Sequence, residues 1–177
     1  MPARVSILIK LPHGGRLGSI MKIGFGYDSH RFEPGPGLVL GGVHVDHGRS
    51  LAGHSDADAV LHAVTDALLG AIGGGDIGEL FADDDPQWAD ADSSVFVVKV
   101  MEMVTSSGLR VENCDITIIA EEPKLSKYKK PMCLRIAELL GVDAAAVNVK
   151  AKTNEKMGFA GRGEGLVVMA AVLVSEQ

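Results

Sequence analysis

Hydrophobic positions along the chain follow two different periods, and these periods predict the order of its strands and helices. Short apolar runs rich in β-branched residues predict strands at residues 22–27, 38–45, 109–120, 147–152 and 166–174. Apolar residues at helical spacing predict helices at residues 55–70, 92–106 and 131–140. Because the last two strands are joined by a loop rather than a helix, we expect a mixed sheet packed on one side by helices, in the α+β class.

Glycine, proline and polar residues separate these elements. Loops are expected at residues 31–37, 46–49, 75–88, 121–126 and 153–165, and a single turn at 143–146. Ser55 followed by Asp58 resembles a capping box, so we expect the first helix to begin near Ser55 and to end at Gly70 or at the glycines of 73–75. The helix at 92–106 is apolar nearly all round, which favours burial on more than one side and hence a subunit contact.

The length and composition of the chain exclude several classes of protein. A length of 177 residues predicts one domain, residues 21–177, preceded by an extension at residues 1–20 that is not part of the core. A net charge of −6 argues against nucleic acid as a partner. The sequence contains 2 cysteines and no long apolar run, which predicts a reduced, cytoplasmic setting and no membrane span.

Polar residues with the chemistry of metal ligands gather in the first third of the chain. Asp28 and His30 are two residues apart, so on a strand their side chains point the same way. A second group has a spacing of four residues, which on a helix makes one polar stripe: His54, Asp58, His62 and Asp66. Two histidines and a carboxylate from the two groups could form a three-ligand divalent metal site, which is the open arrangement of catalytic zinc. The alternative is an ordinary solvated helix face.

Two other stretches could bind a ligand, although each also has a simpler interpretation. The segment Gly75–Gly78, followed by three aspartates at 83–85, could hold polyol hydroxyls, or it could be a flexible acidic loop. The Gly-rich segment at 152–165 could hold phosphate through backbone N–H groups, or it could be a plain strand connection. Within it, Glu155 is a candidate Mg²⁺ ligand, and Arg162 with Lys124 could face an anion or simply be solvated.

The combination of these motifs resembles the 2-C-methyl-D-erythritol 2,4-cyclodiphosphate synthases. The matching motifs run in order from about Met21 to Val174: Gly-Phe-Gly-Tyr-Asp-Ser-His, Gly-His-Ser-Asp-Ala-Asp, Asp-Ala-Leu-Leu-Gly, Gly-Asp-Ile-Gly, Asp-Ile-Thr-Ile-Ile-Ala, Asn-Val-Lys-Ala and Gly-Phe-Ala-Gly-Arg-Gly-Glu-Gly. The resemblance implies a cytoplasmic homotrimer with active sites between subunits. It also implies cyclisation of 4-diphosphocytidyl-2-C-methyl-D-erythritol 2-phosphate with release of CMP, in the non-mevalonate isoprenoid pathway.

The resemblance also implies roles for particular residues. Zn²⁺ would be held by Asp28, His30 and His62, and a Mg²⁺ or Mn²⁺ that bridges the diphosphate by Glu155. His54 and Thr153 would take part in catalysis. The implied substrate contacts are Asp28, Ser29, His30, His54 and Ser55; Asp76, Ile77 and Gly78; Phe81, Ala82, Asp83, Asp84 and Asp85; Ala120, Glu121, Glu122, Pro123, Lys124, Leu125 and Ser126; and Lys152, Thr153, Asn154, Glu155, Phe159 and Arg162. Asp58 and Asp66 would orient the histidines.

The chain departs from the family pattern at a few of these positions. Lys152 and Asn154 replace common threonines, Ala82 replaces a common proline, and Asp84 replaces a common threonine. We expect the added charge of Lys152 to alter phosphate contacts, while Thr153 and Glu155 keep the chemistry.

Two other classes of protein could be built from the same residues. A zinc hydrolase would need a general base beside a metal-bound water, and His54 or Asp58 could serve. A non-catalytic, metal-stabilised oligomer that binds nucleotides is the second. Water uptake into the product would identify the hydrolase, and loss of the fold on chelation would identify the structural metal.

Overall fold

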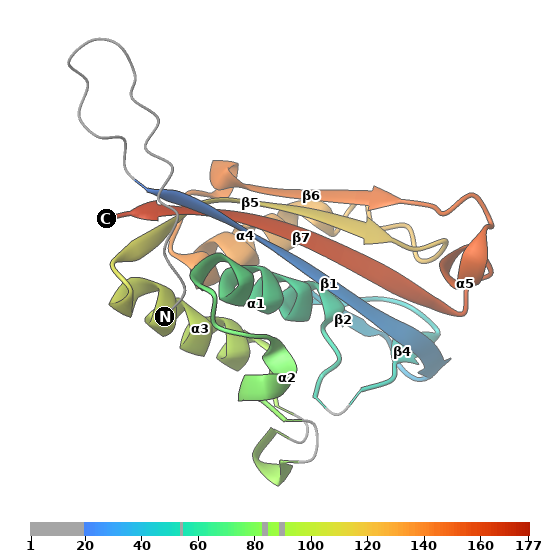
Figure 1. Ribbon diagram of the computed structural model, residues 1–177. Coiled ribbons are helices and arrows are strands. Elements are labelled where there is room, and N and C mark those ends of the chain that lie inside the picture. Colours follow the sequence, from blue (N-terminus) through green and yellow to red (C-terminus); the bar gives the residue numbers. More distant parts are fainter. Residues whose placement is uncertain (1–19, 54, 83–84, 89–90) are drawn as a thin grey trace.

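The computed structural model describes residues 20–53, 55–82, 85–88 and 91–177, and it has a sheet covered by helices on one face (Figure 1). The strands are β1 (Met21–Pro34), β2 (Leu38–Leu40), β3 (Val43–Val45), β4 (Arg49–Leu51), β5 (Leu109–Ile119), β6 (Val147–Lys152) and β7 (Gly165–Glu176). The helices are α1 (Ala59–Ile72), α2 (Ile77–Leu80), α3 (Ser94–Ser106), α4 (Lys129–Leu140) and α5 (Gly158–Gly161), with single 3₁₀ turns at Pro86–Trp88 and Ala144–Ala146.

The main sheet has five strands in the order β4-β1-β7-β5-β6. Antiparallel pairs join β4 to β1, β1 to β7 and β7 to β5, whereas β5 and β6 are parallel. The helix α4 lies in the connection between the two parallel strands, because a parallel pair needs a long crossover. The expected mixed sheet of the α+β class is confirmed, and the strand predicted at 38–45 is an antiparallel pair, β2 and β3, joined by Gly41 and Gly42.

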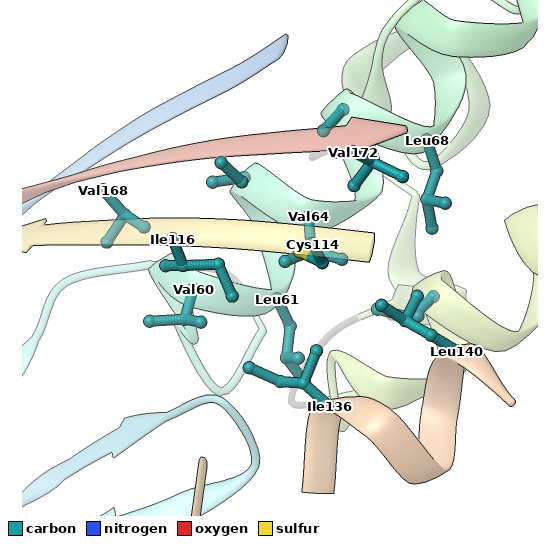
Figure 2. Packing of buried hydrophobic residues seen from close by; sticks show 14 of the residues in the cluster. Val60, Leu61, Val64, Leu68, Cys114, Ile116, Ile136, Leu140, Val168 and Val172 are labelled. Atoms are coloured by element: carbon teal, nitrogen blue, oxygen red, sulfur yellow. The ribbon is translucent and has the colours of Figure 1, made fainter. Parts of the chain in front are cut away.

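The core lies between the sheet and the layer of α1, α3 and α4 (Figure 2). Branched aliphatic side chains of β5 and β7 meet α1, and Ile136 and Leu140 of α4 complete the layer. Cys114 lies fully buried in this core, and burial raises the pKa of its thiol to about 12. No helix within the described part of the chain has both the length and the apolarity needed to cross a membrane.

The opposite face of β1 is apolar and exposed. The side chains of Ile23, Phe25 and Tyr27 are 72%, 63% and 48% exposed, while Gly24 and Gly26 between them are buried toward the helices. Side chains alternate across a strand, so the Gly-Phe-Gly motif presents glycine to α1 and aromatic rings to the helix-free face.

Several predicted boundaries were wrong. The first strand continues through residues 31–34 because these pair with β4 and with Gly165 of β7, so the loop expected at 31–37 begins only after Pro34. The turn expected at 46–49 ends where Arg49 opens β4. The expected loops at 75–88 and 153–165 contain α2, a 3₁₀ turn and α5.

The first helix begins at Ala59 rather than near Ser55, because Asp58 is its N-cap. It ends at Gly73, whose φ of 70° is left-handed and favours glycine. The helices expected at 92–106 and 131–140 are confirmed apart from their first residues. On α3, Val95 and Val98 are 39% and 45% exposed, and the predicted subunit contact of this helix stays a prediction.

Candidate metal centre and pocket

Three metal-ligating side chains converge between β1 and α1. Asp28 and His30 lie on the face of β1 that meets α1, and His62 lies in the first turns of that helix. The Nε2 atom of His30 is 2.9 Å from Oδ2 of Asp28, and Nδ1 of His62 is 3.2 Å from the same oxygen. One ligand atom from each residue falls within 4.8 Å of the other two. Nitrogen and carboxylate donors at this spacing fit a single divalent cation.

Two glycines allow this convergence. A Cβ atom at Gly24 would lie 1.7 Å from the carbonyl oxygen of Ala67, and one at Gly26 would lie 1.9 Å from that of Ala63. The backbone of α1 therefore rests directly on β1, which brings His62 within reach of Asp28.

The tautomer of His30 is fixed by the chain segment before α1. The Nδ1 atom of His30 lies 2.6 Å from the carbonyl oxygen of Ala52, which can only accept a hydrogen bond. Nδ1 must therefore carry the proton, so in the neutral ring the lone pair on Nε2 points at Asp28 and His62. This is the arrangement that a neutral histidine needs to bind a metal.

The charges at the triad also suit a cation. Burial would raise the pKa of the Asp28 carboxyl, but the hydrogen bonds with His30 and His62 outweigh burial and hold the pKa well below its usual range. Burial would lower the pKa of His30, but the protonated form of the ring can also donate from Nε2 to Asp28, and this hydrogen bond raises the pKa overall. Asp28 is thus an anion at neutral pH, and it attracts positive charge between the two rings.

The triad opens into a cavity of about 220 Å³. Its lining contains the metal triad with Gly53, Ser55, Asp66, Ile77, Gly78, Phe81, Ala82, Trp88 and Phe96. The rings of Phe81 and Phe96 lie 4.6 Å apart, and Trp88 packs on Phe81 with 5.2 Å between the ring centroids. One wall of the cavity is therefore aromatic, and the ring of Phe96 lies 6.0 Å from that of His62. Pockets of this kind bind small molecules.

Several predicted substrate residues lie in this pocket or hold its walls. Ser55, Ile77, Gly78, Phe81 and Ala82 line it directly. Asp76 caps α2 by accepting a 3.0 Å hydrogen bond from the N–H of Glu79, and Asp85 caps the 3₁₀ turn that carries Trp88. The predictions for His54, Asp83 and Asp84 fall outside the described residues, as does most of the extension at 1–20.

A second, more open cavity of about 760 Å³ shares His30 and Gly53 with the first. Ser29 and Phe159, two of the predicted substrate contacts, line it together with Arg31 and Glu164. Arg162 is exposed and pairs with Glu164 at 2.6 Å, an interaction that raises the pKa of the guanidinium.

The predicted nucleotide and phosphate segments lie together, but away from the triad. The segment Ala120–Ser126 follows β5, and the segment Lys152–Glu155 follows β6. Across the sheet, Asp28 is paired with Val168, Val168 with Ile118, and Ile118 with Ala151. Three strand spacings separate β1 from β6, or about 14 Å. None of these residues lines the cavity at the triad.

Glu121 joins the two segments. Its Oε1 accepts hydrogen bonds from the backbone N–H groups of Asn154 and Lys156, at 3.0 and 3.2 Å. Glu155 and Lys156 have left-handed φ values of 50° and 64°, which are uncommon for residues with a side chain. The carboxylate of Glu121 stabilises this turn, and Thr153 donates a 2.6 Å hydrogen bond to Glu155 at the same place. In the 120–126 segment, Leu125 is buried, while Glu122, Lys124 and Ser126 are exposed.

The expectation that Asp58 orients a histidine was wrong. Asp58 is fully buried, and its carboxylate accepts hydrogen bonds from the N–H groups of Gly41, Gly42, Val60 and Leu61, at 2.6 to 3.0 Å. It is committed to the N-cap and to the turn between β2 and β3, so it does not face the pocket. The predicted polar stripe therefore breaks at its second member, and Asp58 is excluded as a general base.

Asp66 does line the pocket, but its hydrogen bond goes to the chain rather than to a histidine. It accepts a 2.8 Å bond from the N–H of Ile77 and thereby fixes the start of α2. Burial raises the pKa of its carboxyl.

We predict that Asp58→Asn lowers the free energy of unfolding by about 2 kcal/mol, because an amide would present N–H groups to backbone donors. Zn²⁺ affinity should stay within about twofold of the parent, since the carboxylate does not contact the triad. Urea denaturation of the metal-free protein and a chelator competition assay measure the two quantities. Loss of Zn²⁺ affinity without loss of stability would show that Asp58 acts at the metal centre after all.

The sequence did not reveal two of the pocket-lining rings. Trp88 and Phe96 come from a 3₁₀ turn and from α3, respectively, and they meet only through tertiary packing. The one available signal was the single tryptophan of the chain, which lies within an acidic stretch.

Fold and site together define an α+β protein with a pocket for a small ligand and a three-residue centre for a divalent cation. Comparison of the sequence with known proteins assigns the chain to one family within this class. Residues 21–175 match the model of the YgbB family, and the chain belongs to that family. The resemblance to cyclodiphosphate synthases that the motifs indicated is thereby confirmed.

Named relatives and a solved structure agree with this placement. The 2-C-methyl-D-erythritol 2,4-cyclodiphosphate synthase of Cupriavidus pinatubonensis is 53% identical over 154 residues, which cover 87% of this chain and 91% of that protein. The synthase of Listeria monocytogenes is 50% identical over 157 residues, covering 89% and 100%. The CDP complex of IspF from Plasmodium falciparum superposes with a TM-score of 0.78 at 31% identity, covering 89% of this chain and 97% of that one.

Proposed function

We propose that this chain converts 4-diphosphocytidyl-2-C-methyl-D-erythritol 2-phosphate into 2-C-methyl-D-erythritol 2,4-cyclodiphosphate and CMP, in the non-mevalonate pathway of the cytoplasm. The observation that carries the proposal is the cluster of Asp28, His30 and His62 at the mouth of a small pocket, in a chain about half identical to curated synthases of that name. The two free cysteines agree with a reducing compartment.

The reaction needs no nucleophile from the protein. An oxygen of the substrate's 2-phosphate attacks the β-phosphorus, a new P–O bond forms, and the bond to the oxygen of CMP breaks. Electrons and atoms balance without water. Catalysis then consists of folding two anionic groups against each other and holding them in line.

Different residues of the chain would bind and align these anionic groups. Asp28, His30 and His62 would hold a Zn²⁺, and Glu155 would help to hold a Mg²⁺ or Mn²⁺. Bound cations of this kind neutralise phosphate oxygens as Lewis acids. The hydroxyl of Ser55 lines the pocket and can donate to a phosphate oxygen. The aromatic wall excludes water, while Asp76 and Asp66 fix the short helix α2 against which the erythritol would lie.

The remaining contacts fall to the segments joined by Glu121. Backbone groups of 120–126 would enclose the cytidine, and Thr153 would orient a phosphate beside Glu155. These segments do not line the cavity at the triad of their own chain. We therefore propose a homotrimer in which the 120–126 and 152–156 segments of one copy face the triad of the next. The exposed apolar face of β1 supports this assembly, because apolar patches of this kind mark subunit contacts.

Product analysis tests the proposed reaction. The protein is supplied with substrate and Mg²⁺ in ¹⁸O-labelled water, and ³¹P spectra and mass spectrometry follow the products. We expect CMP and a cyclic diphosphate, neither of which contains ¹⁸O. Label in either product would identify the zinc hydrolase, and the absence of turnover in a protein that binds CDP would favour the non-catalytic alternative.

We predict that Glu155→Ala raises the Mg²⁺ concentration needed for half-maximal turnover about tenfold or more, because the second cation loses a carboxylate ligand. Zn²⁺ content should not change. Glu138→Ala, which removes an exposed carboxylate from α4, is the control. An unaltered Mg²⁺ titration would remove Glu155 from the second metal site.

A further inference from the structure

We propose that Ser93 and Asp56 are positioning residues that select the metal-binding tautomer of His62. The proposal rests on the metal triad of the proposed function, and it adds two residues to which neither the sequence motifs nor the family resemblance gave a role. Both come from outside β1 and α1: Asp56 precedes α1, and Ser93 is the residue just before α3.

The contacts form a chain behind the imidazole of His62. Its Nε2 atom lies 2.8 Å from the Oγ of Ser93, and that Oγ lies 2.5 Å from Oδ1 of Asp56. The backbone N–H of Ser93 donates to Oδ2 of the same carboxylate at 3.2 Å. Ser93 is fully buried, so water does not compete for its hydroxyl.

The donor and acceptor capacities allow one direction along this chain. An ionised carboxylate only accepts hydrogen bonds, so the single proton of the Ser93 hydroxyl goes to Asp56. Ser93 must then accept from His62, which requires the proton on Nε2. A neutral imidazole with its proton on Nε2 has its lone pair on Nδ1, the atom that faces Asp28. The carboxylate of Asp28 is the competing acceptor on that side, but its contact with the ring is 3.2 Å long, against 2.8 Å for Ser93.

One neighbouring hydroxyl could compete for the same proton. The Oγ of Ser55 lies 3.2 Å from Nε2 of His62, a longer contact than that of Ser93. Ser55 also lines the pocket, where its hydroxyl is available to a ligand. We therefore assign orientation of the ring to Ser93, and contact with substrate to Ser55.

His62 and His30 are thus held in complementary ways. The carbonyl of Ala52 places the proton of His30 on Nδ1, and Ser93 places that of His62 on Nε2. Both lone pairs then point into the same space before any metal arrives. Partners of this kind typically contribute about 10- to 100-fold to metal affinity.

The test measures Zn²⁺ affinity and the tautomer of His62, neither of which requires turnover. We expect Ser93→Ala to weaken Zn²⁺ binding about 10- to 100-fold in a chelator competition. In the metal-free protein, the ring ¹⁵N shifts of His62 should change from those of the Nε2-protonated form toward those of the Nδ1-protonated form, because Asp28 remains as an acceptor beside Nδ1. Excess Zn²⁺ should restore most of the turnover. Ser94→Ala removes the adjacent serine, which does not contact His62, and should leave all three quantities unchanged.

Asp56→Asn supplies an independent variant if Ser93→Ala does not fold. It should produce the same change in tautomer, and its effect on Zn²⁺ affinity should disappear in the Ser93→Ala background, because Asp56 acts through Ser93. An unchanged tautomer together with Zn²⁺ affinity within twofold of the parent, in either folded variant, would overturn the proposal. Additive effects in the double variant would show that Asp56 acts by another route. A protein that keeps these responses but lacks cyclase activity would contradict the proposed function alone.

Discussion

Replacing His62 by alanine is expected to lower Zn²⁺ affinity, and turnover at ordinary Zn²⁺ concentrations, by more than about 100-fold. The estimate follows because partners that merely orient a ligand already contribute about 10- to 100-fold. The substitution removes one of three donors and leaves Asp28 paired with His30 alone, 2.9 Å away. A site with two protein ligands binds Zn²⁺ weakly, because water and buffer molecules must supply the other ligands.

The measurements are metal content after dialysis, Zn²⁺ affinity by chelator competition, and CMP release. His44→Ala is a matched control, because His44 is an exposed histidine on β3, with a side chain that is 62% exposed. It should behave as the parent protein does. Stoichiometric zinc in His62→Ala would remove this residue from the ligand set. Unlike Ser93→Ala, this variant should not recover its turnover in excess Zn²⁺.

Gly26→Ala is expected to reduce the free energy of unfolding by at least about 4 kcal/mol. Destabilisation of this size is exceptional for a single substitution, and severe overpacking is one of its few causes. The added methyl carbon would lie 1.9 Å from the carbonyl oxygen of Ala63, and both partners are backbone that cannot rotate away. The helix α1 would have to move off β1. Any folded fraction should also bind Zn²⁺ less tightly, because His62 would move away from Asp28.

Urea denaturation with and without Zn²⁺ measures both effects. Gly48→Ala is the control, because a Cβ there meets nothing within 4 Å, and the change should stay within about 0.5 kcal/mol. Equal stability of Gly26→Ala and the parent would show that β1 and α1 are not in direct backbone contact.

The same glycines show what can be predicted from the sequence and what cannot. The two-residue period of Asp28 and His30 sufficed to place their side chains on one face of a strand. By propensity alone Gly24 and Gly26 weaken that strand, because propensity describes a strand in isolation. In the fold they are required by the helix that crosses them, and that contact depends on α1, about 40 residues later in the chain.

The predicted polar stripe failed for a related reason. A spacing of four residues describes a helix that is already formed, whereas Asp58 lies where the helix begins. Its carboxylate was free to cap α1 and to bind the turn at Gly41 and Gly42, which is distant in sequence. The link between Asp56 and Ser93 spans 37 positions of the sequence, and no local pattern signals such a pair.

The alternation along β1 also limits which changes in length this chain can accept. Each residue from Gly24 to His30 faces either α1 or the open side of the sheet. Deleting a single residue from this heptapeptide would exchange the two sets, so that aromatic rings would meet the helix backbone and the metal ligands would point outward. Insertions and deletions within this segment should therefore abolish function. They should be tolerated at the exposed turn around Gly48, where a change in length does not alter which face of a strand a side chain occupies.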